Sequence, residues 1–144
     1  MLDFISNSEK ETIEFAIKFA ENLDNNSIIL LSGDLGSGKT KFTQGILSYF
    51  NLEDEISSPT FTIINEYKNE TINIFHFDLY RLEDIDEFFA IGGDEYFGKG
   101  ICIFEWGEIL EPELKDISYT KISFSKDEIN TNKRILKIKN INRG

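Results

Sequence analysis

Eight consecutive residues constrain the fold of this chain more than any other feature. Residues Gly33–Thr40 read Gly-Asp-Leu-Gly-Ser-Gly-Lys-Thr, which matches the phosphate-binding pattern of a glycine, four free positions and Gly-Lys-Ser/Thr. The segment follows a continuous apolar run, Ser27–Leu31, which is typical of a buried strand. It precedes residues 40–50, where Phe42 and Ile46 recur at helical spacing. Strand, loop and helix in this order predict a nucleotide-phosphate site in an α/β fold.

The residue types in this segment suit phosphate chemistry. Its glycines allow the backbone to turn sharply and to bring N–H groups close to phosphate oxygens, and the start of the next helix adds partial positive charge. Lys39 is expected to reach the outer phosphates, and the Thr40 hydroxyl is expected to ligate Mg²⁺. The predicted phosphate-binding residues here are Gly33, Leu35, Gly36, Ser37, Gly38, Lys39 and Thr40.

Length and composition narrow the class of protein. The 144 residues predict a single domain over 1–144, and no apolar run is long enough to span a membrane. The first residues lack the basic region and apolar core of a signal peptide, so a cytoplasmic location is expected. The one cysteine, Cys102, lies in an apolar run and is expected to be buried. A net charge of −11 argues against tight direct binding of tRNA or DNA and favours a basic protein partner, although the acidity could serve solubility alone.

The remaining sequence predicts a compact sheet flanked by helices. Ser8 and Glu11 form the capping pattern of a helix start, and apolar residues then repeat at helical spacing. Further predicted elements are a hairpin of runs 61–67 and 71–77, a short helix over 84–90, a buried strand over 101–104 and a C-terminal hairpin of 121–124 and 135–138. We therefore predict an α/β sheet that is parallel near the phosphate loop and partly antiparallel elsewhere.

Two carboxylates follow strand-like runs and are candidates for holding the metal or orienting water at the phosphate site. Asp78 closes one run and Glu105 closes another, and ligands of open α/β sheets collect at the carboxyl ends of strands. Either carboxylate could instead merely cap its strand beside solvent.

Thr60 lies in a Ser-Pro-containing connection, where a hydroxyl could contact the metal or the terminal phosphate as switch loops do. Arg81 could contact phosphate or pair with Glu83 or Asp84, and Trp106 could stack on a ring or simply pack.

The order of several motifs resembles one known family. After the phosphate loop come Ser-Pro-Thr-Phe-Thr at 58–62, Asn-Glu-Tyr at 65–67, His-Phe-Asp-Leu-Tyr-Arg at 76–81 and Glu-Trp at 105–106. This pattern is similar to the TsaE (YjeE) family, bacterial ATPases of tRNA threonylcarbamoyladenosine biosynthesis. The matched stretch runs from the first buried strand to Trp106. One departure is Gly107, which stands where the family often has proline.

The resemblance implies a function, cofactors and partners. It implies slow Mg²⁺-dependent ATP hydrolysis that resets or regulates a TsaB–TsaD transferase, with tRNA reached only through that complex. It implies that Asp78, Glu105 and Lys39 are catalytic, and that Thr40 and Glu105 ligate the metal. It also implies a switch-like loop around Thr60 and, by a looser match, Arg134 near the nucleotide.

Three alternatives remain open from the residues alone. A small kinase acting on a nucleoside or metabolite is one, although only Arg81, Arg134 and Arg143 could neutralise a transferred phosphate. A GTPase is a second, but the Asn-Lys pair at 132–133 is not followed by the expected acidic position. A nucleotide-gated adaptor whose hydrolysis is incidental is the third.

Overall fold

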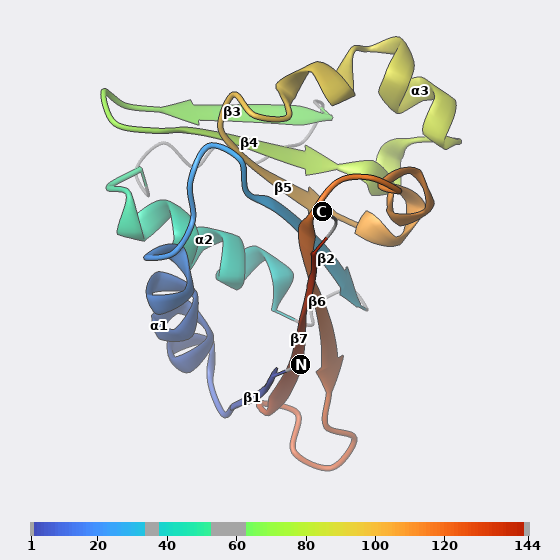
Figure 1. Cartoon of the computed structure of the whole chain (residues 1–144). Coiled ribbons are helices and arrows are strands. Elements are labelled where there is room, and N and C mark those ends of the chain that lie inside the picture. The colour runs from blue at the N-terminus through green and yellow to red at the C-terminus, as the bar shows by residue number, and fades with distance from the viewer. Residues whose placement is uncertain (1, 34–37, 53–62, 143–144) are drawn as a thin grey trace.

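A single seven-stranded sheet organises the protein (Figure 1). The computed structural model describes residues 2–33, 38–52 and 63–142. The strand order is β1-β7-β6-β2-β5-β4-β3, which places the phosphate-loop strand β2 in the middle. The strands are β1 (Leu2–Ser6), β2 (Ile28–Gly33), β3 (Ile64–Lys68), β4 (Asn73–Asp78), β5 (Ile101–Glu105), β6 (Tyr119–Lys126) and β7 (Arg134–Ile141), and the α-helices are α1 (Glu9–Ala20), α2 (Lys39–Tyr49) and α3 (Ile85–Ala90).

The sheet is mixed, as the sequence predicts. Strand β2 pairs in parallel with both β5 and β6, and β5 pairs in parallel with β4. The pairs β3–β4, β6–β7 and β1–β7 are antiparallel. The α/β class and the parallel centre with antiparallel edges are therefore confirmed, and so are both predicted hairpins.

Apolar side chains cover both faces of the sheet because successive residues of a strand point to opposite sides. Ile29 and Leu31 of β2 belong to the cluster that packs against α1 and α2. Leu30 belongs to the cluster on the other face, where Phe88 of α3 meets Phe104 with ring centroids 5.8 Å apart. Figure 1 shows α1 and α2 on one side of the sheet and α3 on the other. None of the helices in the described part of the chain is long and apolar enough to cross a membrane.

Local sequence signals explain where the helices begin. The Ser8 hydroxyl accepts a hydrogen bond from the Glu11 N–H at 3.1 Å, which confirms the predicted cap of α1. Asp84 caps α3 in the same way, and Gly92 follows that helix with φ +74, a conformation that favours glycine.

Cys102 is buried as predicted, and burial raises the pKa of its thiol to about 12.

Strand β1 was not predicted from the sequence. Residues 2–6 alternate only weakly in polarity, and they pair with β7 at the opposite end of the chain, with Phe4 opposite Leu136. The strand is formed because a distant partner supplies its hydrogen bonds and because Phe4 packs on the α1 side of the core. This addition extends the C-terminal hairpin into a three-stranded antiparallel unit.

Candidate functional site

The candidate site lies at the carboxyl ends of three neighbouring parallel strands. Glu105, the last residue of β5, is in register with Leu31 of β2 on one side and with Asp78 of β4 on the other. Gly33 ends β2 at the same edge, two residues beyond Leu31. Because the strands are parallel, their carboxyl ends meet, and the two predicted carboxylates therefore lie on adjacent strands.

Lys39 is the first residue of α2 and is almost completely buried, with 5% of its surface exposed. Its Nζ donates a hydrogen bond to the Gly33 carbonyl at 2.7 Å and lies 3.8 Å from the centroid of the Trp106 ring. The preceding residue, Gly38, has φ +109, which a side chain would strain. This turn directs the helix N-terminus and the lysine to the carboxyl edge of β2.

His76 holds the carboxylate of Glu105 in place. The His76 Nε2 lies 3.1 Å from the Glu105 Oε2, and both side chains are largely buried. Burial alone favours the neutral acid, but the hydrogen bond and charge of His76 and the charge of Lys39 outweigh it, so the pKa of Glu105 lies below its ordinary value. Glu105 is therefore an ionised hydrogen-bond acceptor at neutral pH.

Asp78 is engaged by its own chain. Its Oδ1 accepts a hydrogen bond from the Tyr80 N–H at 3.2 Å, which caps the 3₁₀ turn Leu79–Arg81. Its Oδ2 accepts from the Arg81 Nε at 3.1 Å, whereas the sequence suggested Glu83 or Asp84 as partners of this arginine. One oxygen of the Asp78 carboxylate thus stabilises the turn that follows β4.

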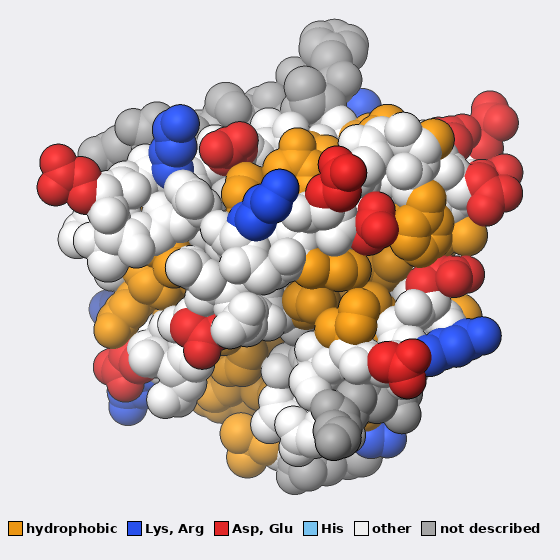
Figure 2. All heavy atoms as spheres, turned by 45° about the horizontal axis from the view of Figure 1, so that its top comes forward, with side chains coloured by type: hydrophobic (Ala, Val, Ile, Leu, Met, Phe, Trp, Pro, Cys, Tyr) orange, Lys and Arg blue, Asp and Glu red, His pale blue; other side chains and the backbone are white. Residues whose placement is uncertain are grey.

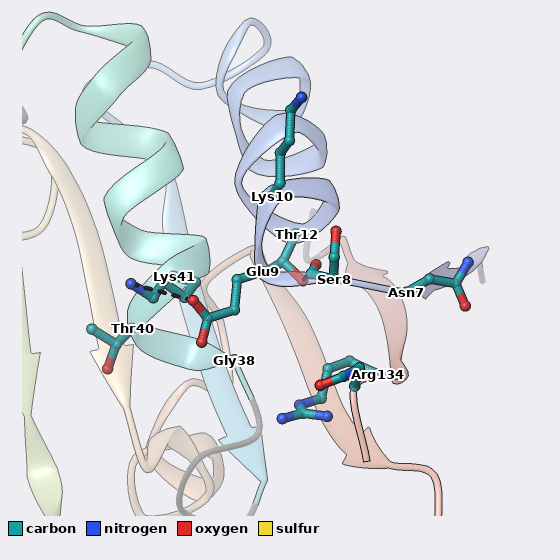
Figure 3. A pocket seen from close by; sticks show the side chains of 10 residues that line it. Asn7, Ser8, Glu9, Lys10, Thr12, Gly38, Thr40, Lys41 and Arg134 are labelled. Carbon is teal, nitrogen blue, oxygen red and sulfur yellow. Dashed lines mark hydrogen bonds and ion pairs between the residues drawn. The ribbon is translucent and has the colours of Figure 1, made fainter. Parts of the chain in front are cut away.

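A cavity of about 570 Å³ opens beside the start of α2 (Figure 3). It lies between the N-termini of α1 and α2 and the start of β7, and Figure 3 shows Arg134 entering from the β7 side. Two of its lining residues, Lys41 and Glu9, form an ion pair at 3.7 Å. Its lining residues are Asn7, Ser8, Glu9, Lys10, Thr12, Gly38, Thr40, Lys41, Asn132 and Arg134.

The structure brings together some of the predicted residues. Lys39 and Glu105 share the edge of β2 and β5, with Asp78 on the next strand. Gly38, Thr40 and Arg134 instead line the neighbouring cavity. Leu35, Gly36, Ser37 and Thr60 lie outside the described residues, so their predicted roles stay predictions.

Three features of the site were missed in the sequence. For His76, a position inside a strand-like run favours a structural role, yet its two-residue spacing from Asp78 places it on the same face of β4. Trp106 contacts Lys39, which no local pattern indicates because 67 positions separate them in the sequence. The cavity lies between the start of α1 and the start of β7, which the unpredicted pairing of β1 with β7 brings together.

Comparison with known proteins identifies the chain. Residues 6–136 match the family model described as threonylcarbamoyl adenosine biosynthesis protein TsaE. The chain belongs to the TsaE family. The resemblance predicted from the motifs is therefore confirmed, and with it the link of this family to tRNA threonylcarbamoyladenosine biosynthesis.

Individual TsaE proteins match over most of the chain. The tRNA threonylcarbamoyladenosine biosynthesis protein TsaE of Rickettsia typhi is 40% identical over 141 residues, covering 94% of this chain and 93% of that protein. The Bacillus subtilis protein of the same name is 44% identical over 88 residues, covering 60% and 54%. The crystal structure of Bacillus subtilis YdiB superposes with a TM-score of 0.71 at 27% identity and covers 98% of this chain and 86% of that one.

Proposed function

We propose that this TsaE chain binds ATP with Mg²⁺ and hydrolyses it slowly, and that this turnover resets or regulates a TsaB–TsaD transferase in tRNA threonylcarbamoyladenosine biosynthesis. One observation carries the proposal. The buried Lys39 ammonium is held at the Gly33 carbonyl, close enough to the ionised Glu105 carboxylate to lower its pKa, at the carboxyl ends of adjacent parallel strands. A fixed cation and a fixed anion at such a place suit a nucleotide phosphate with its metal.

The start of α2 fits an anionic ligand. Along this fully described helix, the first turn contains no acidic side chain, and the N-terminus has no side-chain cap. The backbone N–H groups and the helix dipole are therefore available to phosphate oxygens. Lys39 adds a full positive charge at the same end, where the low local dielectric strengthens its attraction for phosphate.

We propose that the Thr40 hydroxyl and the Glu105 carboxylate would hold a Mg²⁺ ion. Magnesium prefers oxygen ligands and is commonly held by one or two protein groups together with phosphate oxygens and water. Among the residues that the structure describes, no cluster of three or more His, Cys, Asp or Glu side chains forms a complete protein cage. A hydroxyl and a single ionised carboxylate are consistent with this open type of site.

The side chains have separate parts in the proposed reaction. Bound Mg–ATP supplies the anhydride bond that is cleaved and the metal charge that stabilises the leaving group. Lys39 binds and orients the outer phosphates. Glu105, whose pKa is lowered, is a poor proton acceptor and serves as a charged ligand, fixed by His76. Asp78 ends the neighbouring strand β4, and we propose that it orients the attacking water while Arg81 moderates its charge.

The cavity beside α2 suits the nucleoside part of the ligand. Its volume of about 570 Å³ lies within the roughly 300–1,000 Å³ that is usual for small-molecule sites. It begins at Gly38 and Thr40, next to the proposed phosphate site, so one ligand can span both. Arg134 faces this cavity, which supports its proposed place near the nucleotide (Figure 3).

The surface charge supports a protein partner, with tRNA reached only through the complex. Residues 82–98 contain six acidic side chains and no basic one: Glu83, Asp84, Asp86, Glu87, Asp94 and Glu95. Figure 2 shows acidic side chains beside exposed hydrophobic groups on the face that includes α3. Such a face repels a nucleic-acid backbone and attracts a basic protein surface.

The direct test is ATP hydrolysis by the purified chain with and without Mg²⁺. The proposal predicts slow, Mg²⁺-dependent release of phosphate that does not need an acceptor molecule. Turnover that appears only when a nucleoside or another hydroxyl acceptor is added would instead support the small-kinase alternative.

A further inference from the structure

Trp106 holds an unusual backbone conformation directly beside the proposed phosphate site. Its φ of +62 and ψ of +41 are in the left-handed region, and only one other non-glycine residue among those described, Asn51, has a positive φ. This region is unfavourable for a bulky aromatic side chain. A strained residue that the surrounding structure enforces is a reason to ask what its side chain does.

The next residue fixes this conformation. A Cβ added to Gly107 would lie 2.6 Å from the Leu30 Cβ and 3.0 Å from its Cα, which is too close for any side chain. Because glycine has no Cβ, Gly107 can pack directly against the central strand β2, where it is buried. This close packing constrains the turn that follows β5, and the turn places the indole of Trp106 at Lys39.

The indole joins the phosphate-loop lysine to an exposed aromatic ring. The Lys39 Nζ lies 3.8 Å from the centroid of the Trp106 ring. Trp106 also contacts Tyr80: the two ring centroids lie 4.8 Å apart, and the ring planes are tilted by 35°. Tyr80 is 63% exposed although it is a large aromatic residue, and it follows Asp78 in the capped turn after β4.

We propose that Trp106, supported by Tyr80, is a positioning residue for Lys39. This inference rests on the proposed function of the phosphate site. A cation over an aromatic face is attracted by the ring without losing its charge. The indole can therefore orient the ammonium without neutralising it, so the charge still acts on a bound phosphate.

The proposal predicts a specific pattern of ATP affinities. Trp106→Leu should weaken ATP binding on the order of 3- to 30-fold, the range expected for loss of a partly desolvated cation–π contact. Trp106→Phe should restore most of the affinity. In a Lys39→Met background, Trp106→Leu should cause no further loss, because the lysine through which it acts is absent. Equal losses in both backgrounds, with no rescue by phenylalanine, would overturn the proposal.

A second measurement needs no nucleotide. Trp106 is the only tryptophan of the chain, so its fluorescence reports on its surroundings alone. Lys39→Met should change its emission, whereas Lys41→Met is the matched control because Lys41 pairs with Glu9. Unchanged emission in Lys39→Met would exclude the contact. If the wild type bound no ATP but the emission responded as expected, the proposed function would fail while the contact would stand.

Discussion

The His76 Nε2 lies 3.1 Å from the Glu105 Oε2, across the adjacent parallel strands β4 and β5. The contact follows from register. His76 is paired with Ile103 and Asp78 with Glu105, so side chains two residues apart on neighbouring strands share the face that α2 covers. The contact with His76 and the charge of Lys39 thereby outweigh burial, which raises the pKa of Glu105, and the carboxylate stays ionised.

Replacing His76 should change the titration of Glu105. In His76→Phe the hydrogen bond and the charge that lower the pKa are lost while burial remains, so the pKa of Glu105 should rise above its wild-type position. A ¹³C NMR titration of the side-chain carboxyl measures this directly. A wild-type midpoint that equals that of the variant would contradict the role of His76.

The same pair gives a pH dependence of stability. Because the pKa of Glu105 is lowered on folding, its stabilising contribution is complete above its unfolded value of about 4.3 and is lost as the pH falls through the lower folded value. Urea unfolding between about pH 5 and pH 3 should therefore show a steeper loss of unfolding free energy in the wild type than in Glu105→Gln. Parallel curves would refute the sign of the shift.

Removing the charge of Lys39 should weaken ATP binding more than any other single change in α2. Charge-assisted hydrogen bonds contribute about 1.5–3 kcal/mol, so Lys39→Met should lower the affinity by roughly 10- to 150-fold in equilibrium dialysis. Lys115→Met is the control, since Lys115 is an exposed lysine that does not line the cavity beside α2. If both variants bind ATP equally, the phosphate-loop assignment is wrong.

Asp78→Asn should separate catalysis from structure. An asparagine can still accept the Tyr80 N–H and cap the turn, so stability should change by less than about 1 kcal/mol. The negative charge is lost, and turnover should fall on the order of 10- to 1000-fold while ATP affinity changes little. Asp84→Asn, which alters the matching cap of α3, controls for the substitution itself. Equal losses of affinity and turnover would indicate a structural role.

Gly107→Ala tests the packing that directs Trp106. The new methyl group would lie against Leu30, and overpacking of this kind costs about 1–3 kcal/mol in the free energy of unfolding. Glu108→Ala, at the exposed neighbouring position of the same turn, should leave stability nearly unchanged. Chemical denaturation measures both, and a stable Gly107→Ala protein would show that the turn can relax.

Most of the fold could be predicted because its signals are local. The apolar runs of β2 and β5, the Ser8 cap and the two hairpins are each encoded within a few neighbouring residues. Strand β1 could not, because its partner β7 lies at the other end of the chain. For the site, the phosphate-loop pattern identified Lys39, whereas its contact with Trp106 depends on a tight turn against Leu30 that only packing reveals.

The most direct test of the account is the rate of ATP hydrolysis by the purified chain with Mg²⁺, alone and after addition of TsaB and TsaD from the same organism, with Lys39→Met measured in parallel. The account predicts a slow basal rate that rises when both proteins are present, and no comparable rise in Lys39→Met. A rate that ignores TsaB and TsaD, or a Lys39→Met protein that hydrolyses ATP as fast as the wild type, would contradict it.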